Sequence, residues 1–299
     1  MPRPSRVTIV EVGPRDGLQN EAAQIAAADK IAFVDRLSAA GLPVIEAGAF
    51  VSPKWVPQMA DTDAVFAGIA RRPGVRYAAL VPNLAGLDRA RAAAVEDVAV
   101  FAAASETFSR RNINQSIDES LAVYREVCAR ARELGMRVRG YVSTAFGCPF
   151  EGDVAPERVA DVSAALDAMG VAQIAISDTI GVAHPGQVPV VLDAVGRRVP
   201  LERIALHFHD TRGMAAANTL AALDLGIETF DASAGGLGGC PYAPGATGNV
   251  ATEDLVYLLN GLGIATGIDL AAVVEASRYM ESRIGHRLPS RYYRAVTSA

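Results

Sequence analysis

The chain has 299 residues, 51% of them hydrophobic, and a formal net charge of -5 at neutral pH. A chain of this length buries a sizeable core and fits one large domain or two small ones. Its apolar residues are spread evenly and never form the run of about eighteen that a membrane-spanning helix needs. The acidic balance argues against a nucleic-acid surface, which usually requires a basic stripe, so an anionic substrate would need a local basic pocket.

The chain ends and the cysteines favour the cytoplasm. The first expected strand begins at Val7, which leaves no room for a signal peptide, and we find no presequence or anchor motif. Cys128, Cys148 and Cys240 cannot all pair and lie far apart in the sequence, as expected where thiols stay reduced. We therefore expect a cytoplasmic protein. The sequence leaves the oligomeric state open and allows a homo-oligomer such as a dimer.

Apolar, β-branched runs alternate with alanine-rich amphipathic stretches about eight times, which is the pattern of strands followed by crossover helices. The expected strands span residues 7–12, 44–50, 76–81, 97–103, 138–143, 173–177, 203–208 and 229–233. Glycines stand where several helices should end, and a proline stands near the start of one. These residues are Gly41, Gly135, Gly170, Gly226 and Pro156.

Eight such units without an internal linker predict an α/β fold, a (β/α)8 TIM barrel with an added C-terminal helix. We expect a single domain over residues 1–299, with the barrel in 1–265 and a helical extension and tail in 266–299. The added helix is expected at 268–284, and the tail after His286 is expected to be partly disordered. An open doubly wound sheet is the alternative, because periodicity does not give strand order. In a barrel, functional groups should follow the carboxyl ends of the strands.

Two of the four histidines, His207 and His209, lie two positions apart in an apolar, strand-like run. Alternation along a strand points both imidazoles to the same side. Such a pair supplies half of a metal site. The alternative is that both are ordinary polar residues on a half-exposed strand.

Polar residues also follow the ends of other expected strands. Strand one is followed by Arg15, Asp16, Gln19 and Asn20; strand two carries Glu46; strand six ends at Asp178; and strand eight leads into a glycine-rich loop with Cys240, followed by Asn249. In a barrel these ends converge on one mouth, where a carboxylate, two imidazoles and an amide oxygen would be available to one divalent cation.

Each of these residues also has a structural alternative. Asp16 would serve the turn between Gly13-Pro14 and Gly17, and Asp178 would serve as a helix cap. Glu46 lies in an apolar run and needs a partner, so we expect it to hold Arg15 or another buried group rather than a metal. Cys240 would be inert filling in a core, but a thiol in a glycine-rich loop at the active face is expected to be exposed enough to react.

Several long motifs, in order along almost the whole chain, resemble 3-hydroxy-3-methylglutaryl-CoA lyase, a family of metal-dependent TIM-barrel enzymes. The main ones are Val10 to Glu21, Phe50 to Met59 and Gly236 to Ala243, with shorter matches around Asn83, Asn112, Cys148 and Asp178. The resemblance implies that a divalent cation, Mg2+ or Mn2+, is bound by Asp16, His207, His209 and Asn249. The ligand types alone would also suit Zn2+ or Fe2+. One small departure is Ser233-Ala234-Gly235-Gly236 before the cysteine loop, where we expect Ser-Val-Ala-Gly.

The implied reaction is retro-Claisen cleavage of 3-hydroxy-3-methylglutaryl-CoA to acetoacetate and acetyl-CoA. The tertiary hydroxyl loses its proton as the bond breaks, so the site needs a Lewis acid on that oxygen and a base beside it. We expect Asp178 to be this base, with His207 as the alternative. Arg15, oriented by Glu46, would stabilise the thioester enolate, and Cys240 would protonate its carbon from a closing loop.

The expected partner is a small acyl-CoA, with no nucleic acid and no membrane. Lys54, Arg110 and Arg111 are candidate partners for the CoA phosphates, and Asn83 and Asn112 are candidate contacts for the CoA arm. Three other functions remain open: a Claisen synthase of the same superfamily, a lyase for a related 3-hydroxyacyl-CoA, and an inactive metal-binding or acyl-CoA-binding protein. The synthases lack the Gly-Gly-Cys-Pro-Tyr loop and usually carry a further regulatory domain.

Overall fold

The strands close into one barrel. The computed structural model describes residues 2–239 and 248–298 and pairs eight parallel strands in chain order, with β1 also pairing with β8. The strands are β1 (Thr8–Glu11), β2 (Val44–Ala49), β3 (Arg76–Leu80), β4 (Asp97–Ala103), β5 (Arg137–Ser143), β6 (Gln173–Asp178), β7 (Ile204–Phe208) and β8 (Thr229–Ala232). The closed order confirms the expected barrel and excludes the open doubly wound sheet.

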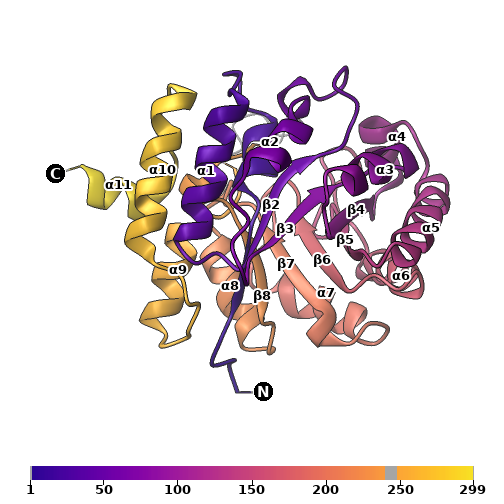
Figure 1. The fold of residues 1–299 in the computed structure, drawn as a ribbon. Coiled ribbons are helices and arrows are strands. Elements are labelled where there is room, and N and C mark those ends of the chain that lie inside the picture. Colours follow the sequence, from indigo (N-terminus) through magenta and orange to yellow (C-terminus); the bar gives the residue numbers. More distant parts are fainter. Residues whose placement is uncertain (1, 240–247, 299) are drawn as a thin grey trace.

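Helices surround the barrel and cover its outer face (Figure 1). They are α1 (Ala27–Ala39), α2 (Thr62–Gly68), α3 (Leu84–Ala92), α4 (Glu106–Ile113), α5 (Ile117–Glu133), α6 (Pro156–Ala168), α7 (Gln187–Gly196), α8 (Ala215–Leu223), α9 (Thr252–Gly261), α10 (Leu270–Ile284) and α11 (Arg291–Thr297). Short helical turns are η1 (Gly13–Gly17), η2 (Pro57–Met59), η3 (Leu201–Arg203) and η4 (Ala234–Gly236). In the described part of the chain, no helix is long and apolar enough to cross a membrane.

The strand sequences explain why the barrel is the buried centre. Every residue of β2 and of β7 is buried, because side chains on one face fill the barrel and those on the other pack under the helices. Polar residues such as Glu46, His207 and Asp231 are therefore held inside an apolar frame. The thiols of Cys128 and Cys148 are buried and free.

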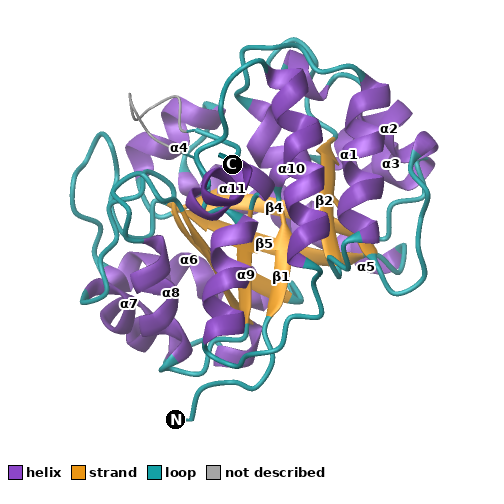
Figure 2. Cartoon of the chain, turned by 90° about the vertical axis from the view of Figure 1, so that its left-hand side faces the viewer, coloured by secondary structure: helices purple, strands orange, loops and turns teal. Residues whose placement is uncertain are grey.

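The C-terminal extension is more ordered than the sequence suggested. Helix α10 packs against α1 and α9, as expected for an added helix, and α11 packs against α9 (Figure 2). The prediction of a disordered tail after His286 was wrong for the described residues. Tyr293 is buried and donates a hydrogen bond to Glu281 at 2.7 Å, and Ser290 donates one to Asp254 at 2.9 Å. These partners lie on α9 and α10, so local sequence gave no sign of them.

Two buried glutamates hold the turns at the carboxyl end of the barrel. Glu11 accepts hydrogen bonds from the backbone N–H groups of Gly13 at 2.8 Å and Ala234 at 2.9 Å. Glu253 accepts one from the N–H of Gly235 at 2.8 Å. Glu11 thus ties the turn after β1 to the turn after β8, while Glu253 anchors the latter to α9. The turn after β1 carries Arg15 and Asp16, the first residues of the candidate site.

Candidate metal centre and active site

Asp16 is presented by the tight turn η1 that follows β1. The turn is a single π-helical segment with Pro14 near its start, and Asp16 lies on it with its side chain partly exposed. Gly17 is needed there because a Cβ atom would lie 2.8 Å from Ser233 Oγ and 2.9 Å from Leu237 Cβ. The close approach brings the turn after β1 against the turn after β8. Asp16 is therefore part of the turn, as one interpretation of the sequence expected, and its carboxylate is still available as a ligand for a cation.

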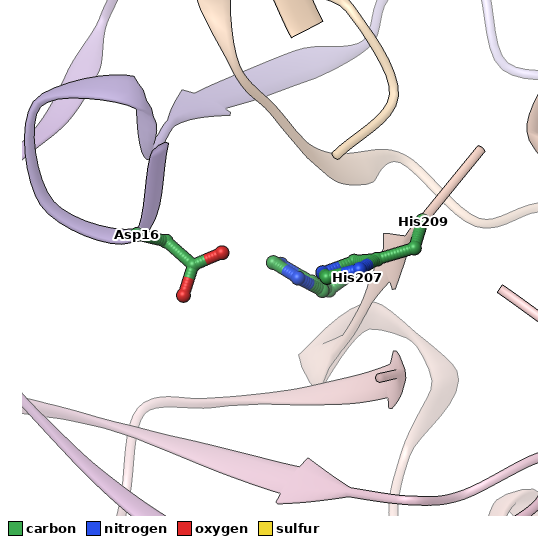
Figure 3. A group of neighbouring side chains, drawn as sticks. All are labelled: Asp16, His207 and His209. Carbon is green, nitrogen blue, oxygen red and sulfur yellow. The ribbon is translucent and has the colours of Figure 1, made fainter. Parts of the chain in front are cut away.

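His207 and His209 come from the carboxyl end of β7. Both side chains are buried, and their ring centroids lie 5.2 Å apart. The two imidazoles point to the same side, toward the carboxylate of Asp16 (Figure 3). His209 lies just beyond β7 and pairs through its backbone with Asn249. The strand is therefore buried rather than half-exposed, and the two imidazoles lie side by side at its end.

These three residues form a group that can hold a metal ion. One ligand atom from each of Asp16, His207 and His209 lies within 4.8 Å of the others. The side-chain amide of Asn249 donates hydrogen bonds to Asp16 Oδ2 at 2.9 Å and to the carbonyl of Leu237 at 3.1 Å. Among the described residues, Asn249 Oδ1 is then buried without a hydrogen-bond partner, and so is His209 Nδ1.

Buried polar atoms without partners are costly in a native protein unless something else satisfies them. A carboxylate, two imidazoles and an amide oxygen at one mouth make a mixed nitrogen and oxygen donor set. The donors brought together by the fold therefore fit a divalent cation.

Arg15 is held in place by Glu46, as the sequence predicted for this contact. Glu46 Oε2 accepts hydrogen bonds from Arg15 Nε at 2.9 Å and from its terminal nitrogen at 2.7 Å. The same oxygen accepts a bond from the Tyr141 hydroxyl at 3.1 Å. The other terminal nitrogen of Arg15 lies 2.6 Å from Asp16. The guanidinium is thus fixed beside the group of possible metal ligands.

Two residues that the sequence analysis missed lie beneath His207. Asp231 of β8 is buried, and its Oδ2 lies 3.1 Å from His207 Nδ1. Arg139 of β5 binds both oxygens of this carboxylate, at 2.6 and 3.0 Å. The signal for Asp231 was available, because it interrupts the apolar run of β8 in the way that Glu46 interrupts β2. A buried carboxylate in a strand requires a partner.

The charges around the site favour the forms that bind a cation. Burial alone would raise the pKa of Asp16, but Arg15 and the two histidines outweigh it and hold this pKa well below its usual range. Burial, with His207 nearby, lowers the pKa of His209 to about 4. Near neutral pH Asp16 is therefore ionised and His209 neutral, the forms in which carboxylate and imidazole act as ligands.

Asp178 lies at the end of β6 and is almost fully buried. Its Oδ1 accepts a hydrogen bond from the Val182 N–H at 2.9 Å, and its Oδ2 accepts one from Ala183 at 3.0 Å. The side chain therefore caps the loop after β6, while α7 begins only at Gln187. Burial raises the pKa of Asp178 to about 6, although the two N–H groups and His207 act in the opposite direction.

A cavity of about 410 Å³ opens beside Asn249. Its lining includes the side chains of Arg212, Arg291 and Arg294, which the sequence analysis did not single out. Arg212 donates to the carbonyl of Gly181 at 2.9 Å, and Arg291 lies 3.4 Å from Asp210. Asp210 and Asp254 also line this cavity, so its charge is mixed, with arginines in excess. Only the tertiary structure brings the loop after β7 to α11, so local sequence did not mark the cavity.

The residues considered for the CoA contacts follow β2, β3 and β4. Lys54 is exposed in the loop after β2, and Asn112 is exposed on α4. Asn83 caps α3 by accepting a hydrogen bond from the Gly86 N–H at 2.9 Å. Arg110 forms an ion pair with Glu106 at 2.9 Å, and Arg111 lies over the ring of Phe150. Asn83 and the two arginines thus have structural roles of their own.

Cys240 lies outside the described residues. The chain leading to it is described through Gly239, whose carbonyl accepts a hydrogen bond from the side chain of Asn20 at 2.9 Å. Asn20 belongs to the segment after β1, close to Asp16 in sequence. The described start of the cysteine loop is therefore joined to the turn that carries the site.

Comparison with known proteins agrees with this geometry. The HMGL-like family model matches residues 6–280. A 3-hydroxy-3-isohexenylglutaryl-CoA/hydroxymethylglutaryl-CoA lyase of Pseudomonas aeruginosa is 56% identical over 293 residues, which cover 98% of each chain. A hydroxymethylglutaryl-CoA lyase crystal structure from the same species superposes with a TM-score of 0.98 at 55% identity, covering 100% of this chain and 99% of that one.

A more distant solved structure adds a bound ligand. It is an HMG-CoA lyase of Acinetobacter baumannii in complex with coenzyme A and 3-methylmalate, with a TM-score of 0.93 and 39% identity over 98% of this chain and 95% of that one. The family model covers most of this chain, and the identities extend over nearly its whole length. The chain belongs to the HMGL-like family.

Proposed function

We propose that this protein is a divalent-metal-dependent hydroxymethylglutaryl-CoA lyase. It would cleave 3-hydroxy-3-methylglutaryl-CoA to acetoacetate and acetyl-CoA. The observation that carries the proposal is the meeting of Asp16, His207 and His209 within 4.8 Å, in a chain 56% identical to a lyase with this activity in its name. Arg15 and Asp178 at the same mouth provide the further groups that this cleavage requires.

The cation would be held by Asp16, His207, His209 and Asn249. Asn249 and His209 each present a buried atom that has no hydrogen-bond partner within residues 2–239 and 248–298, and the carboxylate of Asp16 is ionised. Mg2+ and Mn2+ accept oxygen ligands together with imidazole. When bound, such a cation acts as a Lewis acid on the substrate hydroxyl and lowers the pKa of that group.

Asp178 is the proposed base that accepts the proton of the tertiary hydroxyl. With a pKa of about 6, its carboxylate is mostly ionised at neutral pH yet basic enough to take up a proton. The N–H groups of Val182 and Ala183 fix the orientation of the carboxylate. His207 is the alternative base, but its Nδ1 already faces Asp231 and its ring is a proposed ligand, so it is less free to carry a proton.

Arg15 would stabilise the enolate oxygen that develops when acetoacetate departs. Glu46 and Asp16 fix the guanidinium from two sides, so its charge is aimed before the reaction begins. Cys240 is the proposed donor of the proton that the enolate carbon receives. This assignment depends on the glycine-rich sequence around Cys240, since the residue lies outside the described ranges.

The proposed substrate is an acyl-CoA, and two observations support it. The related structure from Acinetobacter baumannii holds coenzyme A. The cavity beside Asn249 is lined by three arginines and two aspartates, so it offers an anionic substrate a small excess of positive charge in a chain that is acidic overall. Lys54, Asn83 and Asn112 remain proposed CoA contacts. Arg110 and Arg111 remain candidate phosphate contacts; like Asn83, they already have partners in the protein, since Arg110 is paired with Glu106 and Arg111 is stacked on Phe150.

A second candidate substrate carries a longer group at carbon 3. The relative from Pseudomonas aeruginosa is named for both the isohexenyl and the methyl substrate. The cation held by the proposed ligands would bind the hydroxy-acid part, which both molecules share. The metal site therefore does not distinguish the two substrates, and the pocket around the group at carbon 3 would decide which of them is cleaved.

One experiment tests both candidates. Purified protein, stripped of metal and then given Mg2+ or Mn2+, is incubated with the methyl or the isohexenyl substrate under reducing conditions. We expect acetoacetate from the methyl substrate and loss of activity with a chelator. Cleavage of the isohexenyl substrate alone would reject the methyl assignment. Full activity in the chelated protein would reject the metal dependence.

A further inference from the structure

A buried ion pair lies directly under His207. His207 and Asp231 are register partners on the neighbouring strands β7 and β8, and His207 Nδ1 lies 3.1 Å from Asp231 Oδ2. Asp231 is 1% exposed and is bound through both oxygens by Arg139. None of the catalytic roles proposed above uses Asp231 or Arg139.

The chemistry of this contact fixes which nitrogen of His207 carries hydrogen. An ionised carboxylate only accepts hydrogen bonds, so the facing ring nitrogen must donate. The bidentate contact with Arg139 keeps Asp231 in this accepting role and prevents the carboxylate from turning away. With the hydrogen on Nδ1, the lone pair of the neutral imidazole is on Nε2, the only atom then able to bind a cation.

We propose that Asp231 and Arg139 are positioning residues that set His207 in the Nδ1–H form and orient its Nε2 toward the ion. The inference rests on the proposed metal centre but does not depend on the lyase reaction. Carboxylates that accept the second N–H of a metal-bound histidine are a general means of fixing both tautomer and ring orientation.

His209 provides an internal contrast. Its Nδ1 is buried and has no hydrogen-bond partner in the described part of the chain. In the described structure, a carboxylate therefore fixes the tautomer of His207, whereas the Nδ1 atom of His209 has no such partner. The tautomer of His207, but not that of His209, should depend on Asp231.

The same ion pair also connects His207 to the opposite side of the site. Arg139 donates to the Tyr141 hydroxyl at 2.8 Å, and Tyr141 donates to Glu46 at 3.1 Å. Glu46 in turn holds Arg15, which contacts Asp16. A continuous set of buried and partly buried hydrogen bonds thus runs beneath the mouth from one proposed ligand to another.

The tautomer is tested directly in the metal-free protein. Long-range proton–nitrogen NMR separates the two neutral forms of imidazole, and with four histidines in the chain the spectrum is assignable through single His variants. We expect His207 in the Nδ1–H form and, in Asp231→Asn, a shift of population toward the Nε2–H form. His207 in the Nε2–H form in the unaltered protein would overturn the proposal without any variant.

Metal affinity provides the second measurement. Calorimetric titration with Mn2+ should show about 10- to 100-fold weaker binding in Asp231→Asn, the usual cost of losing an outer partner of a histidine ligand. Arg139→Lys should lie between this variant and the unaltered protein, because it keeps the charge but loses the bidentate contact. Asp97→Asn is the matched control, since Asp97 is a partly buried strand aspartate paired with Arg76 at 2.9 Å.

The outcomes separate this inference from the proposed function. The positioning role of Asp231 would be overturned if the Asp231→Asn variant shows a cooperative melting transition and its affinity for Mn2+ lies within twofold of that of the unaltered protein. An equal loss of affinity in Asp97→Asn would also overturn it. Absence of Mn2+ binding in the unaltered protein would remove both the metal centre and the positioning role. Normal binding without lyase activity would reject the proposed reaction and leave the positioning role intact.

Discussion

The side chain of Asn249 donates a hydrogen bond to Asp16 at 2.9 Å, although the two residues are 233 positions apart. The amide nitrogen of Asn249 is the donor, so its amide oxygen, Oδ1, faces away from this bond and has no hydrogen-bond partner in the described structure. A carboxylate and an amide oxygen are thereby fixed next to two imidazoles. The turn after β1 and the segment that carries Asn249, just before α9, form one side of the site only when the barrel closes.

Replacing Asp16 tests the metal centre. Asp16→Asn removes the charge and one ligand oxygen, so the affinity for Mn2+ should fall by about 100-fold or more, beyond the 10- to 100-fold typical of an outer partner. Calorimetry measures this affinity. Asp193→Asn, at an exposed aspartate paired with Arg197, controls for the loss of one surface charge. Unchanged affinity in Asp16→Asn would remove Asp16 from the ligand set.

Replacing Glu46 separates substrate chemistry from metal binding. Glu46→Gln leaves a neutral amide beside the Arg15 guanidinium, so Arg15 loses its charge partner and its fixed orientation. We expect kcat to fall by about 10- to 100-fold while Mn2+ affinity changes little. Tyr141→Phe removes only one donor from the same oxygen and should have a smaller effect. An unchanged kcat in Glu46→Gln would show that Arg15 does not need this contact.

The thiol of Cys240 is tested by removal. Cys240→Ala should lose most turnover, because the enolate carbon then lacks its proton donor, yet it should bind Mn2+ normally. The matched control is Cys128→Ala, which removes a free buried thiol in α5. Turnover near that of the unaltered protein in Cys240→Ala would exclude the thiol from the reaction.

Glu253 predicts a measurable dependence of stability on pH. Burial raises the pKa of Glu253 from 4.5 to about 8, so the folded protein holds this proton more tightly than the unfolded chain. The group is protonated without cost below about pH 4.5, and ionising it while buried lowers the free energy of unfolding as the pH rises from 4.5 to 8. The decline is at most about 1.4 kcal/mol per pH unit.

Glu253→Gln removes this titration while keeping the size of the side chain. Its free energy of unfolding, measured in urea at pH 5 and pH 8, should fall less between the two than that of the unaltered protein. Glu11, whose pKa burial raises to about 7, should keep part of the decline. Glu275→Gln is the control, because Glu275 is exposed. An identical pH dependence in Glu253→Gln and the unaltered protein would contradict the prediction.

The sequence predicted the fold almost completely, because the signals for its strands and helices lie within short stretches of the chain. Strands of a barrel are buried on both faces, so β2 and β7 appear as apolar runs, and glycines such as Gly170 and Gly226 mark the ends of the intervening helices. The general rule that functional groups follow the carboxyl ends of barrel strands then brought Asp16, His207 and His209 to one place. The structure confirms that they meet.

The sequence by itself therefore predicted eight strand–helix units, the residue types available to a cation and a buried partner for Glu46, with Arg15 as the first candidate. Tertiary structure alone decided which groups support them. Asp231 and Arg139 are 92 positions apart, and α11 is ordered by partners on α9 and α10. Periodicity and turn chemistry act over a few residues, whereas these contacts depend on strand register around a closed barrel, which exists only once the whole chain has folded.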